Sequence, residues 1–237
     1  MTEYYHNTGS QNEIDLIGDV FSFIIPKYRE AHDIMVSMLD FNNSAEIRVA
    51  DLGCGFGDLS GRVFEVFPQA VIFGVDRHPE ILTRVKTRFA GYANQFVPVD
   101  GDLNHLSWST NLSALQAVIS SFTLDYLPAK QQKDVIARAF EILESGGRWV
   151  SCEFFRAGDT RINRVFHDIE IMLVQNAIKN GQVTGEQIEQ LSGSSLLRQE
   201  HHVCKIEEKI DWLKQAGFRN IEVPWRFLNI AIISAVR

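Results

Sequence analysis

The sequence predicts an α/β fold with a Rossmann-like, doubly wound, seven-stranded and mostly parallel sheet. Short apolar runs alternate with helical segments from residue 47 to residue 154, which is the pattern of parallel sheets. A glycine-rich loop follows the first of these runs directly. Two helical regions, 1–45 and 157–217, interrupt the alternation, and we expect them to form lids over the sheet.

The expected elements begin with helical periodicity over 13–40, where Pro26 predicts a break into two helices. Pro79 suits the first turn of a later helix. In the core we expect strands over 47–52, 71–75, 95–99, 115–121 and 148–154, and helices over 57–67, 79–89 and 128–144. Beyond it we expect helices over 162–180, 184–197 and 205–216, then strands over 220–223 and 227–236.

The 237 residues fit one α/β domain without a linker. We divide it into an N-terminal helical lid, a cofactor-binding core, a helical insertion and a pair of closing strands. Their ranges are 1–45, 46–156, 157–217 and 218–237.

Composition limits the partners. The net charge of −7 makes nucleic acid a poor default ligand, because phosphate contacts need clustered Lys and Arg. The sequence shows no signal peptide and no apolar run long enough to span a membrane, so we expect a cytoplasmic protein. The three cysteines match no metal spacing and are interpreted as reduced thiols.

The strongest motif is the loop Asp51-Leu-Gly-Cys-Gly-Phe-Gly57 between a strand and a helix. Its glycines allow a sharp turn and a close approach of backbone to ligand, while the following helix points free N–H groups at that ligand. Asp76 ends the next strand, where dinucleotide-binding folds place an acid on a ribose. A nicotinamide cofactor is the alternative, but acids at both ends of the loop, Asp51 and Asp58, suit a cationic amino group better than a pyrophosphate.

This loop resembles the first signature of class I methyltransferases, which implies S-adenosylmethionine as the cofactor. The resemblance places Gly53 at the methionine part, Asp51 near its amino group and Asp76 at the ribose hydroxyls. Gly55 and Arg77 are further candidate cofactor-binding residues. The resemblance also implies that Asp102 and Leu103 bracket the adenine and that Ser120, Ser121 and Phe122 line the far wall.

A closer resemblance extends over most of the chain, in short sequence segments such as Phe122-Thr-Leu-Asp-Tyr-Leu127 and Trp212-Leu-Lys-Gln-Ala-Gly-Phe218. They resemble bacterial enzymes that complete carboxymethoxy-uridine at the tRNA wobble position with a carboxylated S-adenosylmethionine. That subfamily holds the extra carboxylate with an arginine, where this chain has Asp211-Trp212. Since an aspartate repels a carboxylate, we expect the plain cofactor.

Tyr126, Glu153 and His167 are the candidate catalytic residues, and His201 and His202 are further candidate bases. Tyr126 and Glu153 lie near strand ends, and His167 is expected above the mouth of the cleft. No metal site is predicted, because the acids and histidines of 167–168 and 201–202 have no ligand spacing.

We expect methyl transfer to a small-molecule acceptor under the helical lids. The alternative is a tRNA-modifying (carboxy)methyltransferase, and a protein that binds the cofactor without methyl transfer is a third. The tRNA alternative needs a basic surface, for which the candidates are Lys27, Arg29, Arg156, Arg161, Arg164, Lys205 and Lys209. If the chain pairs as a homodimer, the inserted helices would supply the interface.

Overall fold

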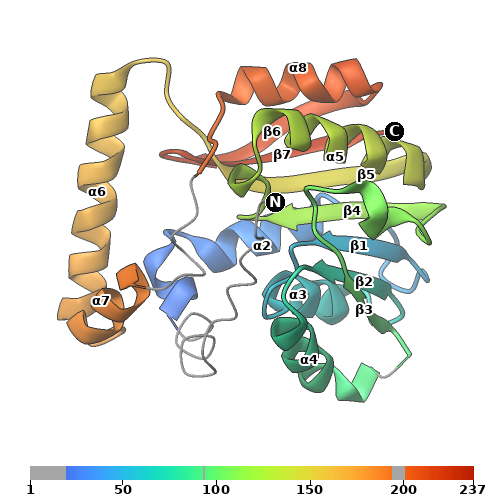
Figure 1. The fold of residues 1–237 in the computed structure, drawn as a ribbon, viewed down its shortest axis with the longest axis horizontal. Helices are drawn as coiled ribbons and strands as arrows, with labels where there is room; N and C mark the ends of the chain where they lie inside the picture. Colours follow the sequence, from blue (N-terminus) through green and yellow to red (C-terminus); the bar gives the residue numbers. More distant parts are fainter. Residues whose placement is uncertain (1–19, 93, 194–200) are drawn as a thin grey trace, which may run out of the picture.

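The computed structural model describes residues 20–92, 94–193 and 201–237, and these form a seven-stranded sheet with helices on both faces (Figure 1). The strand order is β3-β2-β1-β4-β5-β7-β6. The strands are β1 (Arg48–Leu52), β2 (Val71–Asp76), β3 (Phe96–Asp100), β4 (Leu115–Ser121), β5 (Leu143–Phe154), β6 (Arg219–Phe227) and β7 (Ile230–Val236). The pairings among β1–β5 are parallel, and β7 runs antiparallel to both of its neighbours. The predicted fold class is confirmed.

The described helices follow the sequence pattern closely, and the expected helical residues 13–19 and 194–197 lie outside the described residues. The helices are α2 (Tyr28–Ser37), α3 (Asp58–Val66), α4 (Pro79–Arg88), α5 (Ala129–Ile142), α6 (Thr160–Lys179), α7 (Gly185–Gly193) and α8 (Ile206–Ala216), with short 3-10 turns η1 (Ala90–Tyr92), η2 (Leu106–Ser109) and η3 (Leu124–Tyr126). Residues 20–24 are also helical, and the break expected at Pro26 is present. Lys27 takes a left-handed backbone there, with φ 62°, before α2 begins.

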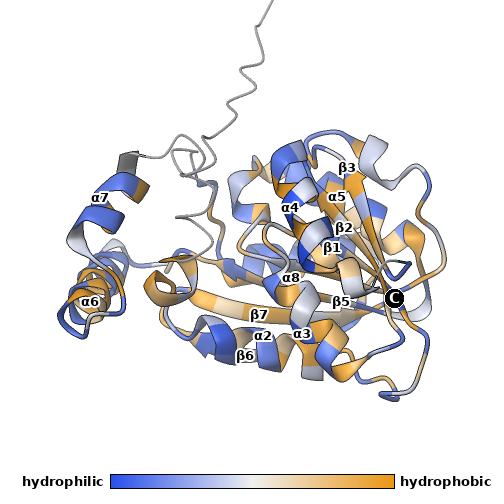
Figure 2. Ribbon diagram, turned by 90° about the horizontal axis from the view of Figure 1, so that it is seen from below, coloured by the Kyte–Doolittle hydropathy of each residue, from blue (hydrophilic) through white to orange (hydrophobic). Residues whose placement is uncertain are grey.

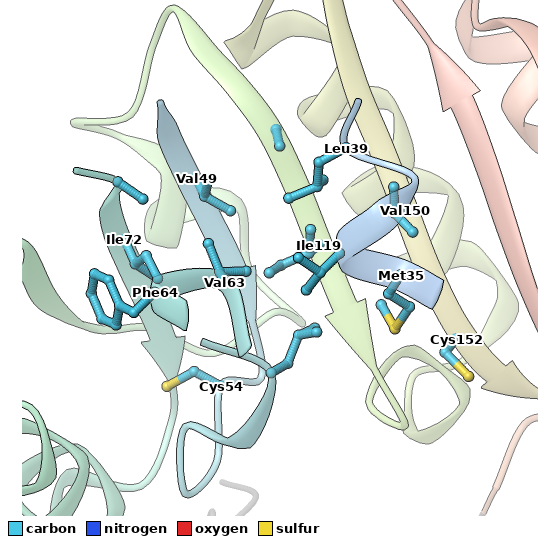
Figure 3. Packing of buried hydrophobic residues seen from close by; sticks show 14 of the residues in the cluster. Met35, Leu39, Val49, Cys54, Val63, Phe64, Ile72, Ile119, Val150 and Cys152 are labelled. Carbon is cyan, nitrogen blue, oxygen red and sulfur yellow. The ribbon is translucent and has the colours of Figure 1, made fainter. Parts of the chain in front are cut away.

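Two apolar cores fill the two faces of the sheet. The first joins β1, β2 and β4 to α2, α3 and α4. Figure 3 shows Met35 of α2, and Leu39 just after this helix, packed beside Ile119 and Val150 of the sheet. The second joins the opposite face to α5 and α8. Hydrophobic residues accordingly line the strands, while the helices carry hydrophilic outer faces (Figure 2). The sheet is therefore covered on both sides, as the near-continuous apolar strands require.

Helices α6 and α7 stand apart from the sheet in both views (Figures 1 and 2). A small third cluster links them to the N-terminal segment: Val20 packs with Ala177, Val183 and Leu191, and Phe21 and Phe56 contact this cluster. Ala177 is the one buried residue of α6. The pair is thus anchored to the rest of the molecule beside residues 20–24. No helix in the described part of the chain is long and apolar enough to cross a membrane.

Two strands are longer than the sequence pattern indicates. β5 begins at Leu143, because Leu143 pairs with Leu115 of β4. Within the turn that follows, the N–H group of Gly146 donates to the carbonyl of Arg237. β6 continues to Phe227 through two irregularities of register, the second around Pro224. The opposite outer strand, β3, also contains a proline, Pro98.

Candidate active site

The glycine loop turns directly out of β1 at the carboxyl end of the sheet. Gly53, Gly55 and Gly57 all have positive φ, at 70°, 49° and 80°, a region that L side chains rarely adopt. The N–H groups of Gly53 and Cys54 donate to the carbonyl of Val75 at 2.8 and 2.9 Å, which ties the loop to β2. A Cβ atom on Gly53 would lie 2.2 Å from Cγ2 of Thr123, so the loop also packs tightly against the segment after β4.

Asp51 lies beneath this loop and is 1% exposed. Its Oδ2 accepts a hydrogen bond from the Ser60 hydroxyl of α3 at 2.6 Å. Burial raises the pKa of Asp51 to about 7, although the Ser60 hydrogen bond acts in the opposite direction. A cation bound next to Asp51 would therefore stabilise the charged form of this buried, poorly solvated carboxyl group.

Asp76 at the end of β2 is held by the loop that it faces. Its Oδ2 accepts from Gly55 N–H at 3.1 Å, and its Oδ1 accepts from the backbone N–H of His78 at 3.0 Å. The Nδ1 atom of the His78 ring lies 3.1 Å from the same Oδ1. The carboxylate is thus fixed in one orientation at the carboxyl edge of the sheet, where ligands of such folds bind.

A cavity of about 220 Å³ opens at this edge. It is lined by eight of the nine predicted cofactor-binding residues: Asp51, Gly53, Gly55, Asp76, Arg77, Asp102, Leu103 and Ser121. The ninth, Ser120, lies elsewhere, because its buried hydroxyl donates to the carbonyl of Leu52 at 3.0 Å and joins β4 to β1.

Helix α2 supplies part of the opposite wall of this cavity. Tyr28 and His32, one helical turn apart, both line it. The Tyr28 hydroxyl donates to Asp58 Oδ2 at 3.2 Å, and its ring stacks on Phe122 with centroids 5.7 Å apart. His32 Nε2 lies 2.8 Å from the Ser121 hydroxyl. Burial lowers the pKa of His32 to about 4, so this imidazole is neutral at pH 7.

Phe122 is placed at the cavity by an unusual backbone. Its φ of 51° puts a bulky residue in the left-handed region, while its N–H donates to the carbonyl of Cys152 at 2.8 Å. Such conformations cost about 1–3 kcal/mol and cluster at functional sites. The bend turns the Phe122 ring toward Tyr28 on one side and Phe154 on the other, with centroids 5.7 and 5.3 Å away.

The three predicted catalytic residues occupy different places. Tyr126, in η3, lines the cavity, and burial raises the pKa of its hydroxyl. Glu153 is fully buried on β5, where Oε2 accepts the backbone N–H groups of Leu124 and Asp125 at 3.1 and 3.3 Å. Burial raises the pKa of Glu153 to about 8. His167 is exposed on α6 and does not line the cavity.

The sequence pattern did not single out His32. Its signal, visible in hindsight, is the four-residue spacing from Tyr28 on one face of α2. Metal ligation has no support in residues 20–92, 94–193 and 201–237, where no group of three or more His, Cys, Asp or Glu could hold an ion. The three cysteines are free and buried.

The segment that carries the glycine loop and Asp76 is similar to a known protein family. Residues 49–147 match the family model described as a methyltransferase domain. This segment of the chain is a methyltransferase domain. The match spans the glycine loop, Asp76, Asp102 and the strand that ends at Ser121.

Relatives of this methyltransferase carry the name carboxy-S-adenosyl-L-methionine synthase. One from Nautilia profundicola is 20% identical over 92% of this chain and 89% of its own length. Another, from Actinobacillus pleuropneumoniae serotype 5b, is 29% identical over 80% of this chain and 76% of its own length. The predicted likeness to enzymes of a carboxylated cofactor is thus matched by relatives whose name describes synthesis of that cofactor.

Solved structures share the fold at low identity. The CurJ carbon methyltransferase superposes with a TM-score of 0.65 at 13% identity, covering 92% of this chain and 57% of its own. Human N-acetylserotonin methyltransferase, solved with S-adenosylmethionine, gives a TM-score of 0.62 at 16% identity over 95% of this chain and 56% of its own. The chain therefore spans a little over half of each of these proteins.

Asp211 is not positioned to repel a carboxylated cofactor, contrary to the expectation from the sequence. Asp211 lies on α8, is 64% exposed as a side chain, and does not line the cavity. Trp212 packs between the ammonium groups of Lys133 and Lys209 instead, with each nitrogen 5.2 and 5.5 Å from the ring. The helix before the Ala-Gly-Phe turn covers the second core rather than the cofactor site.

Proposed function

We propose that this methyltransferase transfers the methyl group of S-adenosylmethionine to a small-molecule acceptor. The observation that carries the proposal is the shape of the cavity, which runs from the glycine loop to an aromatic wall made by Phe21, Tyr28 and Phe122. Concave sites with apolar walls and a few fixed polar groups suit compact ligands. They also exclude water, which favours transfer to the acceptor over competing reactions.

The residues present fit the cofactor. At Gly53 the Thr123 side chain occupies the place of a Cβ atom, so only glycine fits at this turn of the loop. In this proposal Asp51 receives the amino group of the cofactor, Asp76 its ribose hydroxyls, and Asp102 with Leu103 its adenine. Among the described residues that line the cavity, Arg77 is the one Lys or Arg, and it follows Asp76. The acids and aromatic rings elsewhere in the lining favour a cationic ligand.

The bound cofactor supplies an electrophilic methyl group on a sulfonium cation. The protein's own contribution is to hold the acceptor in line and to keep water out. Tyr28 and Phe122 offer aromatic faces to positive charge. His32, neutral and hydrogen-bonded to Ser121, offers an uncharged polar contact in the same wall.

The surface gives little support to the tRNA alternative. Lys209, one of its candidate basic residues, is 1% exposed and donates to Gln132. Three others are in ion pairs with neighbouring acids: Lys27 with Glu30, Arg156 with Glu208, and Arg161 with Asp159. A phosphate-binding surface needs cations that are exposed and available.

A second candidate function is synthesis of carboxy-S-adenosylmethionine. The observation in its favour is that relatives with this name match over 92–97% of the chain. Mass spectrometry of the cofactor released from freshly purified protein separates the two candidates. Plain S-adenosylmethionine or S-adenosylhomocysteine agrees with methyl transfer, whereas a cofactor heavier by one carboxyl group favours the second candidate.

Calorimetric titration with S-adenosylmethionine tests the cofactor assignment. Asp76→Ala should weaken binding about ten- to hundredfold, since a hydrogen bond to a charged group contributes about 1.5–3 kcal/mol. Asp100→Ala is the matched control, because Asp100 ends the neighbouring strand in register with Asp76 but is exposed and outside the cavity lining. Equal affinities of the two variants would contradict the assignment of Asp76.

A further inference from the structure

One end of the cavity is rich in ionisable side chains. Asp51 and Asp58 both line it, and the Tyr28 hydroxyl donates to Oδ2 of Asp58 at 3.2 Å. Burial is the main cause of the perturbed pKa values of Asp51, Tyr28 and His32, and the charge of Asp58 acts on all three. These four groups therefore lie close together, at the end of the cavity that the proposed function gives to the amino group of the cofactor.

The methionine end of the cofactor also carries a carboxylate. It shares its α-carbon with the amino group, so both must lie at this end of the cavity. Beside two acids an anion is repelled unless positive charge or hydrogen-bond donors face it. Two lining side chains that can be cations, Arg77 and His78, adjoin Asp76 at the proposed ribose site. Arg62 of α3 forms ion pairs with two acids and does not line the cavity.

The backbone of the glycine loop is already engaged within the protein. The N–H groups of Gly53 and Cys54 donate to a carbonyl of β2. The N–H group of Gly55 donates to Asp76, and that of Gly57 donates to a carbonyl of the loop itself. A carboxylate in the cavity therefore needs a partner other than these donors.

His32 is a side chain at this end of the cavity that can become a cation. It lines the cavity, is 2% exposed, and lies against Tyr28 with ring centroids 4.2 Å apart. Its Nε2 atom is 2.8 Å from the hydroxyl oxygen of Ser121, another lining residue. A neutral ring can accept from this hydroxyl or donate to it, but a protonated ring can only donate. Protonation of His32 therefore leaves the Ser121 O–H free to donate to an anion in the cavity.

We propose that binding of the methionine end of the cofactor brings a proton onto His32, and that the imidazolium, acting through Ser121, neutralises the carboxylate of the cofactor. The inference deepens the proposed function and rests on it. Asp51 loses its proton as the ammonium group binds beside it, while His32 gains one. A protonated acid and a neutral base are thus replaced by one ion of each sign, and each ion faces the opposite charge of the cofactor.

Burial keeps both groups mostly uncharged between about pH 4 and pH 7 in the protein without cofactor. It raises the pKa of Asp51 to about 7 and lowers that of His32 to about 4. A buried charge without a partner is unfavourable, and the pKa shifts so that the group stays neutral. A carboxylate close to His32 acts against burial and should raise the His32 pKa to about 6–7, because a nearby opposite charge shifts a pKa by up to about 3 pH units.

The charged and titratable groups around His32 come from two helices and the sheet. Burial is the largest cause of the lowered His32 pKa, and Arg62 adds to it, while Asp58 and Asp33 oppose it. The opposing charges are themselves paired, Asp58 with Arg88 and Asp33 with Arg62. The groups are Tyr28 and Asp33 on α2, Asp58 and Arg62 on α3, Asp51 on β1, and Cys152 on β5.

The first test follows the His32 ring by NMR titration of histidine-labelled protein. His32→Gln identifies its signals among those of the seven histidines, and Ser121→Ala, which removes the hydroxyl beside Nε2, identifies them a second time. Addition of S-adenosylmethionine should raise the His32 pKa from about 4 to about 6–7.

Decarboxylated S-adenosylmethionine is the matched control ligand in this titration. It keeps the ammonium and sulfonium groups and lacks only the carboxylate, so it should leave the His32 pKa low. A His32 pKa that stays near 4 with S-adenosylmethionine bound would overturn the inference. An equal rise with the decarboxylated ligand would overturn it too, because the carboxylate would then have no part in the change.

The second test separates the charge of His32 from its shape. Calorimetric titration compares the affinity of the unsubstituted protein for S-adenosylmethionine with that of His32→Gln, at pH 6 and at pH 8. The affinity ratio should fall about two- to tenfold from pH 6 to pH 8 as the bound-state imidazolium loses its proton. Comparing two proteins at each pH cancels the titration of Asp51 and of the ligand's amino group. The same ratio at both pH values would mean that glutamine changes only packing, and would overturn the inference.

His105→Gln is the matched control variant, because His105 is exposed and outside the cavity lining. Its affinity should equal that of the unsubstituted protein at both pH values. Absence of S-adenosylmethionine binding to the unsubstituted protein would overturn the proposed function and this inference with it. Binding with an unmoved His32 pKa would overturn the inference alone and leave the cofactor assignment in place.

Discussion

Replacing Gly53 with alanine should destabilise the protein more than the same change at Gly55. Both residues have positive φ, at 70° and 49°, which costs an alanine about 1–2 kcal/mol. At Gly55 the nearest atom to an added Cβ is 4.0 Å away, so backbone strain is the whole effect. At Gly53 the new atom would lie 2.2 and 2.3 Å from Cγ2 and Oγ1 of Thr123.

The clash sets the difference between the two variants. To avoid it Thr123 must turn, and its hydroxyl then gives up hydrogen bonds to the carbonyls of Ser121 and Gly53 at 3.0 and 3.3 Å. Two such bonds contribute about 1–3 kcal/mol together. For a chain of this size each kcal/mol corresponds to about 2–4 °C, so Gly53→Ala should melt roughly 2–12 °C below Gly55→Ala.

Differential scanning calorimetry of both variants, stripped of cofactor, measures this difference. Circular dichroism at 20 °C controls for a change of fold. Melting temperatures that coincide would refute the reasoning, because they would mean that the loop can move away from Thr123 without cost. A selective loss at Gly53 would locate the tightest backbone contact of the cofactor loop.

Two further predictions concern buried charges. Burial raises the pKa of Asp51 from its ordinary value of 3.8 to about 7 in the folded protein, so its contribution to the stability of cofactor-free protein should fall as pH rises from about 4 to 7, by up to about 4 kcal/mol. Urea denaturation at pH 5 and pH 8 should show this loss, and Asp51→Asn should remove most of it; an unchanged slope in the variant would contradict the assignment. Lys209→Met should cost about 1–3 kcal/mol, because Gln132 Oε1 loses the buried ammonium that lies 2.6 Å away. The exposed Lys214→Met is its control in the same denaturation experiment, and equal losses would show that the buried hydrogen bond contributes nothing.

The core of the fold and the cofactor loop could be predicted from sequence because their signals are local. The three glycines and the acid at the next strand end stand within 26 residues, from Asp51 to Asp76, and a short apolar strand leads into them. Positive φ at each glycine then follows from the turn itself. These features need no knowledge of distant contacts.

Features that depend on the direction of a side chain were harder to predict. Ser120 and Ser121 are adjacent on β4, but alternate residues of a strand face opposite sides, so one ties β4 to β1 and the other lines the cavity. Glu153 similarly points into a buried network rather than into the cavity. Without the register of the sheet these pairs look equivalent in the sequence.

Contacts between segments that are distant in the sequence could not be predicted from it. The pairing of His201 with Asp125 joins residues 76 positions apart, and the proximity of His32 to Ser121 joins residues 89 positions apart. Asp211 was misplaced for the same reason, because the face of α8 that meets the sheet is set by packing against α5 and β6.

The prolines in the two outer strands have a consequence for self-association. An open sheet exposes unpaired backbone groups along both edges, and these can recruit another strand. Pro98 in β3 and Pro224 in β6 each remove one N–H donor in the middle of an edge, and β6 is also irregular beside Pro224. Growth of the sheet across two molecules is disfavoured at both ends, so the fold carries its own protection against edge-to-edge aggregation.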